Sequence, residues 1–290
     1  MTDIDVAPSL ADSLHEELVG WGVSGGACAL VDVDGIVASA GDIGVLHPWA
    51  SVTKIIAALS VLDVVHDGLL DIDDPAGPPG ATVRHLLAHA SGLAFNETRV
   101  IARPGTRRVY SNVGIDTAVS VACKASRAPD AATLITDRVL RPLGMRGTRL
   151  TGPASHGAVG PLVDLARLAA ELIDPRVLPA RVVADAVNPA FPGLAGLLPG
   201  YGKQVPNDWG LGVELRGEKC PHWMPIEAPA DAFGHFGQAG SFLWVDRSCL
   251  VAAVTLTGTP FGPWAVDAWP RSSSRWLRTW KCQGGRHESS

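Results

Sequence analysis

Residues 47–58 read HPWASVTKIIAA and open an apolar helix pattern over 49–66, which Pro48 is expected to introduce at its first turn. Within it, Ser51 is followed three positions later by Lys54, so both side chains fall on one face of the predicted helix. Burying a lysine is costly unless it is paired or neutral. At the first turn, the unbonded N–H groups and the helix dipole favour negative charge developing at Ser51 Oγ. The stretch therefore indicates a serine nucleophile with a lysine beside it.

Lysine usage makes this pair less easily explained by chance. The chain contains 5 lysines and 19 arginines, so arginine is its usual cation. Only lysine can be made neutral by burial and then accept a proton, whereas arginine stays charged. Because a single serine–lysine spacing is common, we looked for further groups that such a nucleophile needs.

Two other stretches supply candidates. Tyr110 stands in RPGTRRVYSNVGIDTAV (103–119), just before a predicted helix. His235, Gly237 and Gly240 stand in FGHFGQAGSFLWVD (233–246), just before an apolar strand pattern. Taken singly, Tyr110 fits a loop anchor and His235 a structural histidine. Glycines before a strand also suit an edge that another backbone approaches closely.

Together these stretches resemble a known family. Ser51-Val-Thr-Lys54, Tyr110-Ser-Asn112 and His235-Phe-Gly237 resemble the SxxK, YxN and HxG motifs of the penicillin-recognising serine hydrolases. These include class C β-lactamases, DD-peptidases, D-aminopeptidases and related carboxylesterases. Four further segments resemble family stretches in the same order: TVRHLLAHASGL, RPGTRRVYSN, VLRPLGMRGTRL and WGLGVEL. The resemblance extends over about residues 25–260.

The resemblance implies the catalytic roles. Ser51 is expected to form an acyl-enzyme, and Lys54 and Tyr110 to share its proton, pass it to the leaving group and activate the deacylating water. No cofactor and no metal are expected. Cys220 and His222 could form half of a metal site, but no second pair of ligands lies nearby in the sequence.

The resemblance also implies the substrate-binding residues. Asn112 is expected to bind the substrate's acyl side chain and to hold Lys54. The backbone N–H groups of Ser51 and Gln238 are expected to form the oxyanion hole. His235 and Gly237 are expected to line the strand edge where substrate docks.

One departure narrows the expected substrate. Phe236 follows His235 where many β-lactamases and peptidases have threonine, whose hydroxyl helps to hold a substrate carboxylate. We therefore expect a hydrolase of a small soluble ester or amide. The alternatives are a β-lactamase or D-amino-acid peptidase or amidase, an acyltransferase using the same acyl-enzyme, and a non-catalytic binding module.

The order of predicted elements indicates an α/β (α+β) fold. The chain begins with a predicted helix at 9–20 and a predicted hairpin of strands 27–33 and 36–41 that turns at Asp34-Gly35. It ends with predicted strands at 209–217, 241–247 and 250–258 and a helix that is broken or begins near Pro270. Helices are predicted at 82–90, 113–125, 129–141, 160–173 and 177–187.

With this order of elements, the family resemblance implies one β-lactamase/transpeptidase-like catalytic domain over residues 1–290, with an antiparallel sheet flanked by terminal helices and an inserted all-α lobe. The α/β lobe is assigned to 1–75 and 205–290, and the all-α lobe to 76–204. A cleft between them is the expected site.

Composition restricts the partners. The net charge is −5, without a basic stripe interleaved with aromatics, so no nucleic acid is expected; the tail at 271–286 is basic only locally. No apolar run could span a membrane, and the opening residues do not resemble a signal peptide, so a soluble, cytoplasmic protein is expected. The sequence does not indicate an oligomeric state.

Overall fold

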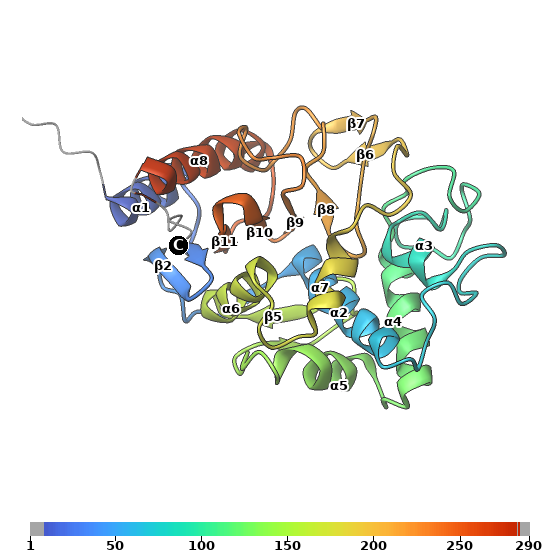
Figure 1. The fold of residues 1–290 in the computed structure, drawn as a ribbon. Coiled ribbons are helices and arrows are strands. Elements are labelled where there is room, and N and C mark those ends of the chain that lie inside the picture. Colours follow the sequence, from blue (N-terminus) through green and yellow to red (C-terminus); the bar gives the residue numbers. More distant parts are fainter. Residues whose placement is uncertain (1–8, 283, 285–290) are drawn as a thin grey trace, which may run out of the picture.

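A six-stranded antiparallel sheet forms the centre of the computed structural model, which describes residues 9–282 and 284 (Figure 1). Residues 1–8, 283 and 285–290, which include the end of the locally basic stretch 271–286, lie outside the described residues. The sheet has the order β2-β1-β11-β10-β9-β8. Its strands are β1 (Gly26–Asp32), β2 (Gly35–Gly41), β8 (Glu214–Leu215), β9 (Phe233–Gly237), β10 (Ser241–Asp246) and β11 (Val251–Thr257). As predicted, strands from both ends of the chain meet, because β1 pairs with β11.

Both faces of the sheet are covered by helices. Helices α1 (Leu10–Gly20) and α8 (Pro263–Cys282) lie side by side on one face, and α6 (Leu162–Ile173) packs on the other (Figure 1). Along β10, Phe242 and Trp244 join the core beneath α8, whereas alternate residues join the larger core beneath α6. This alternation is what a strand buried on both faces requires. The predicted sheet with flanking terminal helices is confirmed.

The middle of the chain is mainly helical. Its helices are α2 (Thr53–His66), α3 (Val83–Leu87), α4 (Asn112–Ser126), α5 (Ala131–Ile135) and α7 (Ala180–Val187), with a 3-10 turn η1 (Ala50–Val52) and a π-helical turn η2 (Thr136–Leu140). A second 3-10 turn, η3 (Arg247–Cys249), joins β10 to β11. Short strands also occur: β3 (His47–Pro48), β4 (Arg149–Leu150), β5 (Ala158–Gly160), β6 (Gly196–Leu198) and β7 (Gly202–Gln204). The expectation of a purely helical middle is therefore wrong in detail, because the loops there pair with one another and with β3.

The chain enters α2 differently from the prediction. Pro48 does not occupy the first helical turn, because it lies in β3 opposite Val159 of β5. Ala50 then adopts a left-handed φ of 45°, an uncommon conformation for a residue with a side chain. Ser51 follows within η1, so the chain turns sharply just before the predicted nucleophile.

Two predicted elements are corrected. Only Glu214–Leu215 of the predicted strand 209–217 pairs with β9; Gly212 has φ 79° and packs so tightly that a Cβ would lie 2.2 Å from Ala58 Cβ. The close turn stops the strand. The last helix is not broken at Pro270, which lies inside α8.

The ends of two other helices also differ from the prediction. Helix α3 ends at Leu87 because His89 is left-handed, with φ 55°, and α7 begins only after Pro179. Within residues 9–282 and 284, no helix is long and apolar enough to cross a bilayer.

Candidate active site

Lys54 is the second residue of α2, and its side chain is entirely buried. Nearly every position of this helix is buried, so the lysine is shielded from solvent. Its Nζ lies 3.1 Å from Ser51 Oγ, 2.7 Å from Asn112 Oδ1 and 2.9 Å from the Ser155 carbonyl oxygen. Burial lowers the pKa of Lys54 to about 7.

These three contacts direct the lysine toward the serine. Neutral Lys54 retains two N–H donors, which the Asn112 amide oxygen and the Ser155 carbonyl oxygen accept. Neither of these oxygens can donate a hydrogen, so the nitrogen lone pair is left for Ser51 Oγ. A neutral lysine held this way can take a proton from the serine hydroxyl.

Asn112 is itself held in one orientation. Its Nδ2 donates to Asn96 Oδ1 at 2.8 Å, so its Oδ1 is the atom that faces Lys54. The preceding Ser111 caps α4 by accepting a hydrogen bond from Gly114 N. Asn96 was not among the predicted site residues, since nothing in the sequence links it to Asn112.

Tyr110 lies on the other side of Lys54, whose Nζ is 4.7 Å from the centre of the tyrosine ring. The Tyr110 hydroxyl is 3.3 Å from His235 Nε2. His235 Nδ1 donates to the Phe236 carbonyl at 2.7 Å, which leaves Nε2 free to accept from the tyrosine. Burial and the nearby Lys54 charge lower the pKa of His235 to about 3, so its ring is neutral.

Burial raises the pKa of the Tyr110 hydroxyl, although a hydrogen bond with Ser51 opposes the rise. The tyrosine is therefore a phenol at neutral pH. It can donate a hydrogen bond or relay a proton, but it is a poor initial base. Lys54, with a pKa of about 7, is the better candidate.

His89 positions the tyrosine loop. Its Nδ1 accepts a hydrogen bond from Ser111 N at 3.2 Å, and its ring centre lies 4.4 Å from that of Tyr110. His89 is fully buried, and burial lowers its pKa well below the ordinary value. His89 has no role of its own predicted from the sequence, because it appears there only as part of the family-like segment TVRHLLAHASGL.

Strand β9 brings the third motif against the nucleophile. A Cβ on Gly237 would lie 2.5 Å from the Trp49 carbonyl oxygen, so only glycine permits this approach to η1. Ser241 Oγ fastens β10 to the same carbonyl at 2.8 Å. On its other side, β8 pairs only with Phe233 and Gly234, which leaves the later residues of β9 without a strand partner there.

A pocket of about 630 Å³ opens at Ser51. Tyr110, His235 and Gln238 also line it. The charged residues Arg107, Arg108 and Glu214 contribute to its wall. The rest of the wall is apolar and consists of Phe95, Ile101, Val109, Leu197, Leu198, Pro199, Trp209 and Phe236. The structure thus brings all seven predicted residues together: four line the pocket, Lys54 and Asn112 lie directly behind Ser51, and Gly237 packs against η1.

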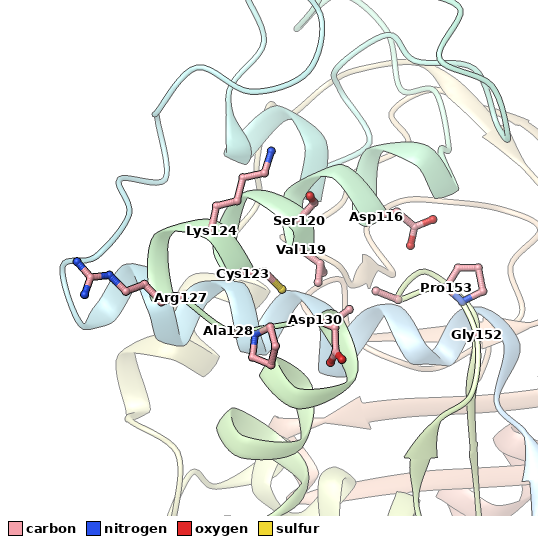
Figure 2. A pocket seen from close by; sticks show the side chains of 13 residues that line it. Asp116, Val119, Ser120, Cys123, Lys124, Arg127, Ala128, Asp130, Gly152 and Pro153 are labelled. Atoms are coloured by element: carbon pink, nitrogen blue, oxygen red, sulfur yellow. The ribbon is translucent and has the colours of Figure 1, made fainter.

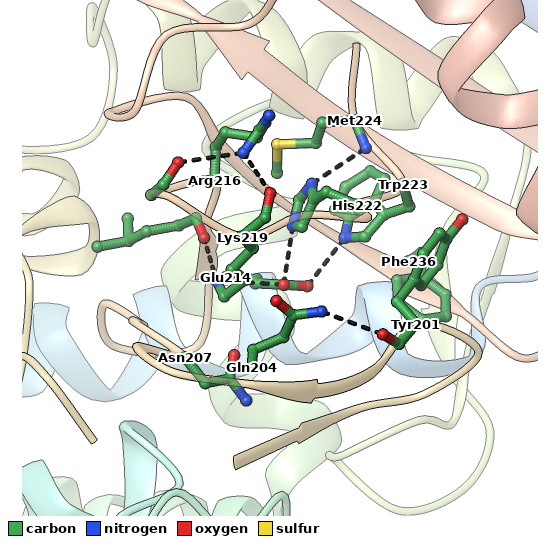
Figure 3. Close-up of polar contacts among 12 residues, drawn as sticks. Tyr201, Gln204, Asn207, Glu214, Arg216, Lys219, His222, Trp223, Met224 and Phe236 are labelled. Carbon is green, nitrogen blue, oxygen red and sulfur yellow. Dashed lines mark hydrogen bonds and ion pairs between the residues drawn. The ribbon is translucent and has the colours of Figure 1, made fainter. Parts of the chain in front are cut away.

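A buried ion cluster supports one wall of this pocket (Figure 3). Glu214 Oε1 lies 2.9 Å from His222 Nε2 and 3.3 Å from Lys219 Nζ, and Oε2 accepts from Trp223 Nε1 at 2.8 Å. Burial alone would raise the pKa of Glu214, but Lys219 and His222 hold it below its ordinary value. His222 is thus engaged by a carboxylate. Sequence reasoning missed Glu214, which it treated only as part of a strand.

Comparison with known proteins gives one family. The family model described as Beta-lactamase matches residues 44–272. A crystal structure described as a beta-lactamase from Mycobacterium bovis shares 45% sequence identity, with a TM-score of 0.88, over 91% of this chain and 97% of the other. No curated protein matches the chain.

More distant structures share the fold. The D-alanine carboxypeptidase AmpC from Burkholderia cenocepacia has 17% identity and a TM-score of 0.74 over 93% of this chain and 99% of the other. EstCE1, a hydrolase with promiscuous acyltransferase activity, has 14% identity and a TM-score of 0.72 over 91% and 99%.

Proposed function

Because the chain belongs to the beta-lactamase family of serine hydrolases, we propose that it cleaves an ester or amide of a small substrate with an apolar acyl group. The reaction passes through an acyl-enzyme on Ser51. The observation that carries this proposal is the position of Lys54, buried, with Nζ 3.1 Å from Ser51 Oγ and two fixed acceptors for its N–H groups.

Acylation begins with neutral Lys54. Its nitrogen takes the proton of Ser51 Oγ, which forms a bond to the substrate carbonyl carbon. The carbonyl oxygen becomes an oxyanion, for which the backbone N–H groups of Ser51 and Gln238 are the proposed donors. Each donor of this kind is worth about 3 kcal/mol of transition-state stabilisation.

The intermediate then collapses. The bond between the carbonyl carbon and the leaving oxygen or nitrogen breaks, and the leaving atom receives a proton. Tyr110 lines the pocket and its hydroxyl is hydrogen-bonded to Ser51, so it can supply that proton, and the proton held by Lys54 then restores the phenol. In deacylation a water molecule attacks the acyl carbon and gives a proton to Tyr110 or Lys54. The bond between the acyl carbon and Ser51 Oγ then breaks, Oγ takes back a proton, and the carboxylic acid is released.

The pocket favours an apolar acyl group. Its exposed rim includes Phe95, Ile101 and Leu197, which are 50%, 46% and 62% exposed. Covering such side chains with a substrate alkyl chain is favourable by roughly 25 cal/mol per Å² of apolar surface removed from water. The third-motif Phe236 contributes a further apolar wall in place of a hydroxyl.

β-Lactam hydrolysis is the second candidate, since the Mycobacterium bovis relative is described as a beta-lactamase. Phe236 argues against it. The side chain packs among Phe261 and Trp269 and offers no donor for a substrate carboxylate. We therefore rank simple esters above β-lactams.

A substrate panel tests the proposal. The wild type and Ser51→Ala should be compared on p-nitrophenyl acetate, butyrate and hexanoate, a matching anilide, and nitrocefin. We expect Ser51-dependent ester turnover that exceeds nitrocefin turnover. Nitrocefin hydrolysed faster than the esters would favour the second candidate, and ester product diverted to added ethanol would indicate acyl transfer.

A further inference from the structure

Asp116 is joined to Lys54 by a single intervening residue. Its Oδ1 accepts a hydrogen bond from Ser155 N at 2.8 Å, and its Oδ2 accepts from Ser155 Oγ at 3.0 Å. The Ser155 carbonyl oxygen in turn accepts from Lys54 Nζ at 2.9 Å. Ser155 is fully buried, so its polar groups depend on these partners.

We propose that Asp116 is a positioning residue for the reaction: it fixes Ser155 with both carboxylate oxygens, and thereby fixes the carbonyl that orients Lys54. This inference rests on the proposed function, in which Lys54 is the base. Asp116 does not line the Ser51 pocket, and it acts on Lys54 through Ser155 and through its negative charge.

The two hydrogen-bond acceptors of Lys54 are held in place in different ways. Asn112 and Ser155 are the two acceptors that leave the Lys54 lone pair for Ser51. Asn112 lies in a regular helix, but Ser155 lies in the loop between β4 and β5, where only a single turn, closed by hydrogen bonds from His156 N and Gly157 N to the Pro153 carbonyl, holds the backbone. The two charge-assisted hydrogen bonds that Asp116 on α4 accepts from Ser155 hold this turn further.

The Asp116 charge also acts on the lysine. Among the groups around Lys54, Tyr110 is a phenol, and His89 and His235 are neutral because burial lowers their pKa values. Burial lowers the pKa of Lys54, and the Asp116 carboxylate opposes this effect. Removing that charge should lower the Lys54 pKa further.

The outer side of Asp116 faces a surface cavity of about 520 Å³ (Figure 2). Lys124, Arg127 and Asp130 also line this cavity, and His156 Nδ1 lies 2.8 Å from Ser155 Oγ. The Asp116 side chain is half-buried, so solvent can reach its carboxylate. Its charge is therefore partly screened, and its influence on Lys54 is moderate.

The test uses the rate at which a fluorophosphonate labels Ser51 as a function of pH, in Asp116→Asn and Asp116→Ala. Asparagine can still accept from Ser155 N but lacks the charge. In wild type the labelling rate should fall at low pH, where Lys54 becomes protonated, and we call this fall the acid limb. For Asp116→Asn we expect the acid limb to move to lower pH by about 0.5 to 1 unit. For Asp116→Ala we expect a further loss of about tenfold or more in the limiting rate. The control is Asp137→Asn, which removes an exposed carboxylate and should change neither the pH position of the acid limb nor the limiting labelling rate.

The outcomes are separable. If Asp116→Asn is labelled with an unmoved acid limb, the positioning role is wrong even if the rate falls, since a merely structural residue would do that. If wild type is not labelled on Ser51, the proposed function itself fails. If circular dichroism shows that Asp116→Ala does not fold, the pH position of the acid limb in Asp116→Asn alone tests the role of Asp116.

Discussion

Lys54 Nζ and Ser51 Oγ lie 3.1 Å apart, and the lysine side chain is entirely shielded from solvent. Both the short distance and the burial are needed for Lys54 to act as a base toward Ser51. Burial lowers the pKa of Lys54 to about 7, so a large fraction of it is neutral near that pH, and the fixed contacts to Asn112 and Ser155 turn the neutral nitrogen toward the serine. The predictions below follow from this geometry.

The pH dependence of turnover should report Lys54. Its pKa is lowered to about 7, and only the neutral form accepts the serine proton. Below that pKa, kcat/KM should fall by about tenfold for each pH unit, with a plateau above it. Initial rates on p-nitrophenyl butyrate from pH 5 to 9 measure this. Activity that is constant down to pH 5 would exclude the lysine as base.

Lys54→Arg should abolish turnover although it retains the positive charge. The guanidinium remains protonated and is too large for a site with no exposed surface. We expect kcat/KM to fall by roughly 10²–10⁴. The control is Lys203→Arg, which makes the same change at an exposed position and should behave as wild type. Turnover within tenfold of wild type in Lys54→Arg would contradict the assignment.

The buried Glu214 cluster should contribute to stability. Glu214→Ala leaves Lys219 and His222 buried without their carboxylate, which should lower the free energy of unfolding by about 3–5 kcal/mol. Glu227→Ala breaks a pair with Arg278 at the surface and should cost about 0–1 kcal/mol. Urea unfolding of both variants makes the comparison. Equal costs would mean that the buried cluster adds nothing beyond a surface pair.

The apolar rim should set the acyl preference. Phe95 lines the pocket, and its ring centre lies 5.8 Å from that of Tyr110. Phe95→Ala should reduce the ratio of kcat/KM for p-nitrophenyl hexanoate to acetate by about tenfold. Val100→Ala is the control, because Val100 is 49% exposed on the same loop but does not line the pocket. An unchanged ratio would place the acyl chain elsewhere.

Much of this arrangement could be predicted from the chain because the relevant signals are local. The hairpin follows from Asp34-Gly35, and the structure turns there between β1 and β2. Ser51 and Lys54 are one helical turn apart, so their proximity follows from spacing alone. Tyr110 and His235 needed the family resemblance, since the contact between them joins residues 125 positions apart.

The remaining features depend on packing between distant segments. Asp116 and Ser155 are 39 positions apart, and neither belongs to a recognisable motif. The strand predicted at 209–217 is short because Gly212 turns against α2, a contact that no strand pattern reveals. Glu214 looks like an ordinary strand residue until Lys219 and His222 are folded back onto it.

The most direct test of the central claim is the mass of the enzyme quenched during turnover of p-nitrophenyl butyrate, followed by peptide mapping. We predict one butyryl group on the peptide that contains Ser51, and neither adduct nor ester hydrolysis in Ser51→Ala. A butyryl group on another residue, or undiminished hydrolysis by Ser51→Ala, would contradict it.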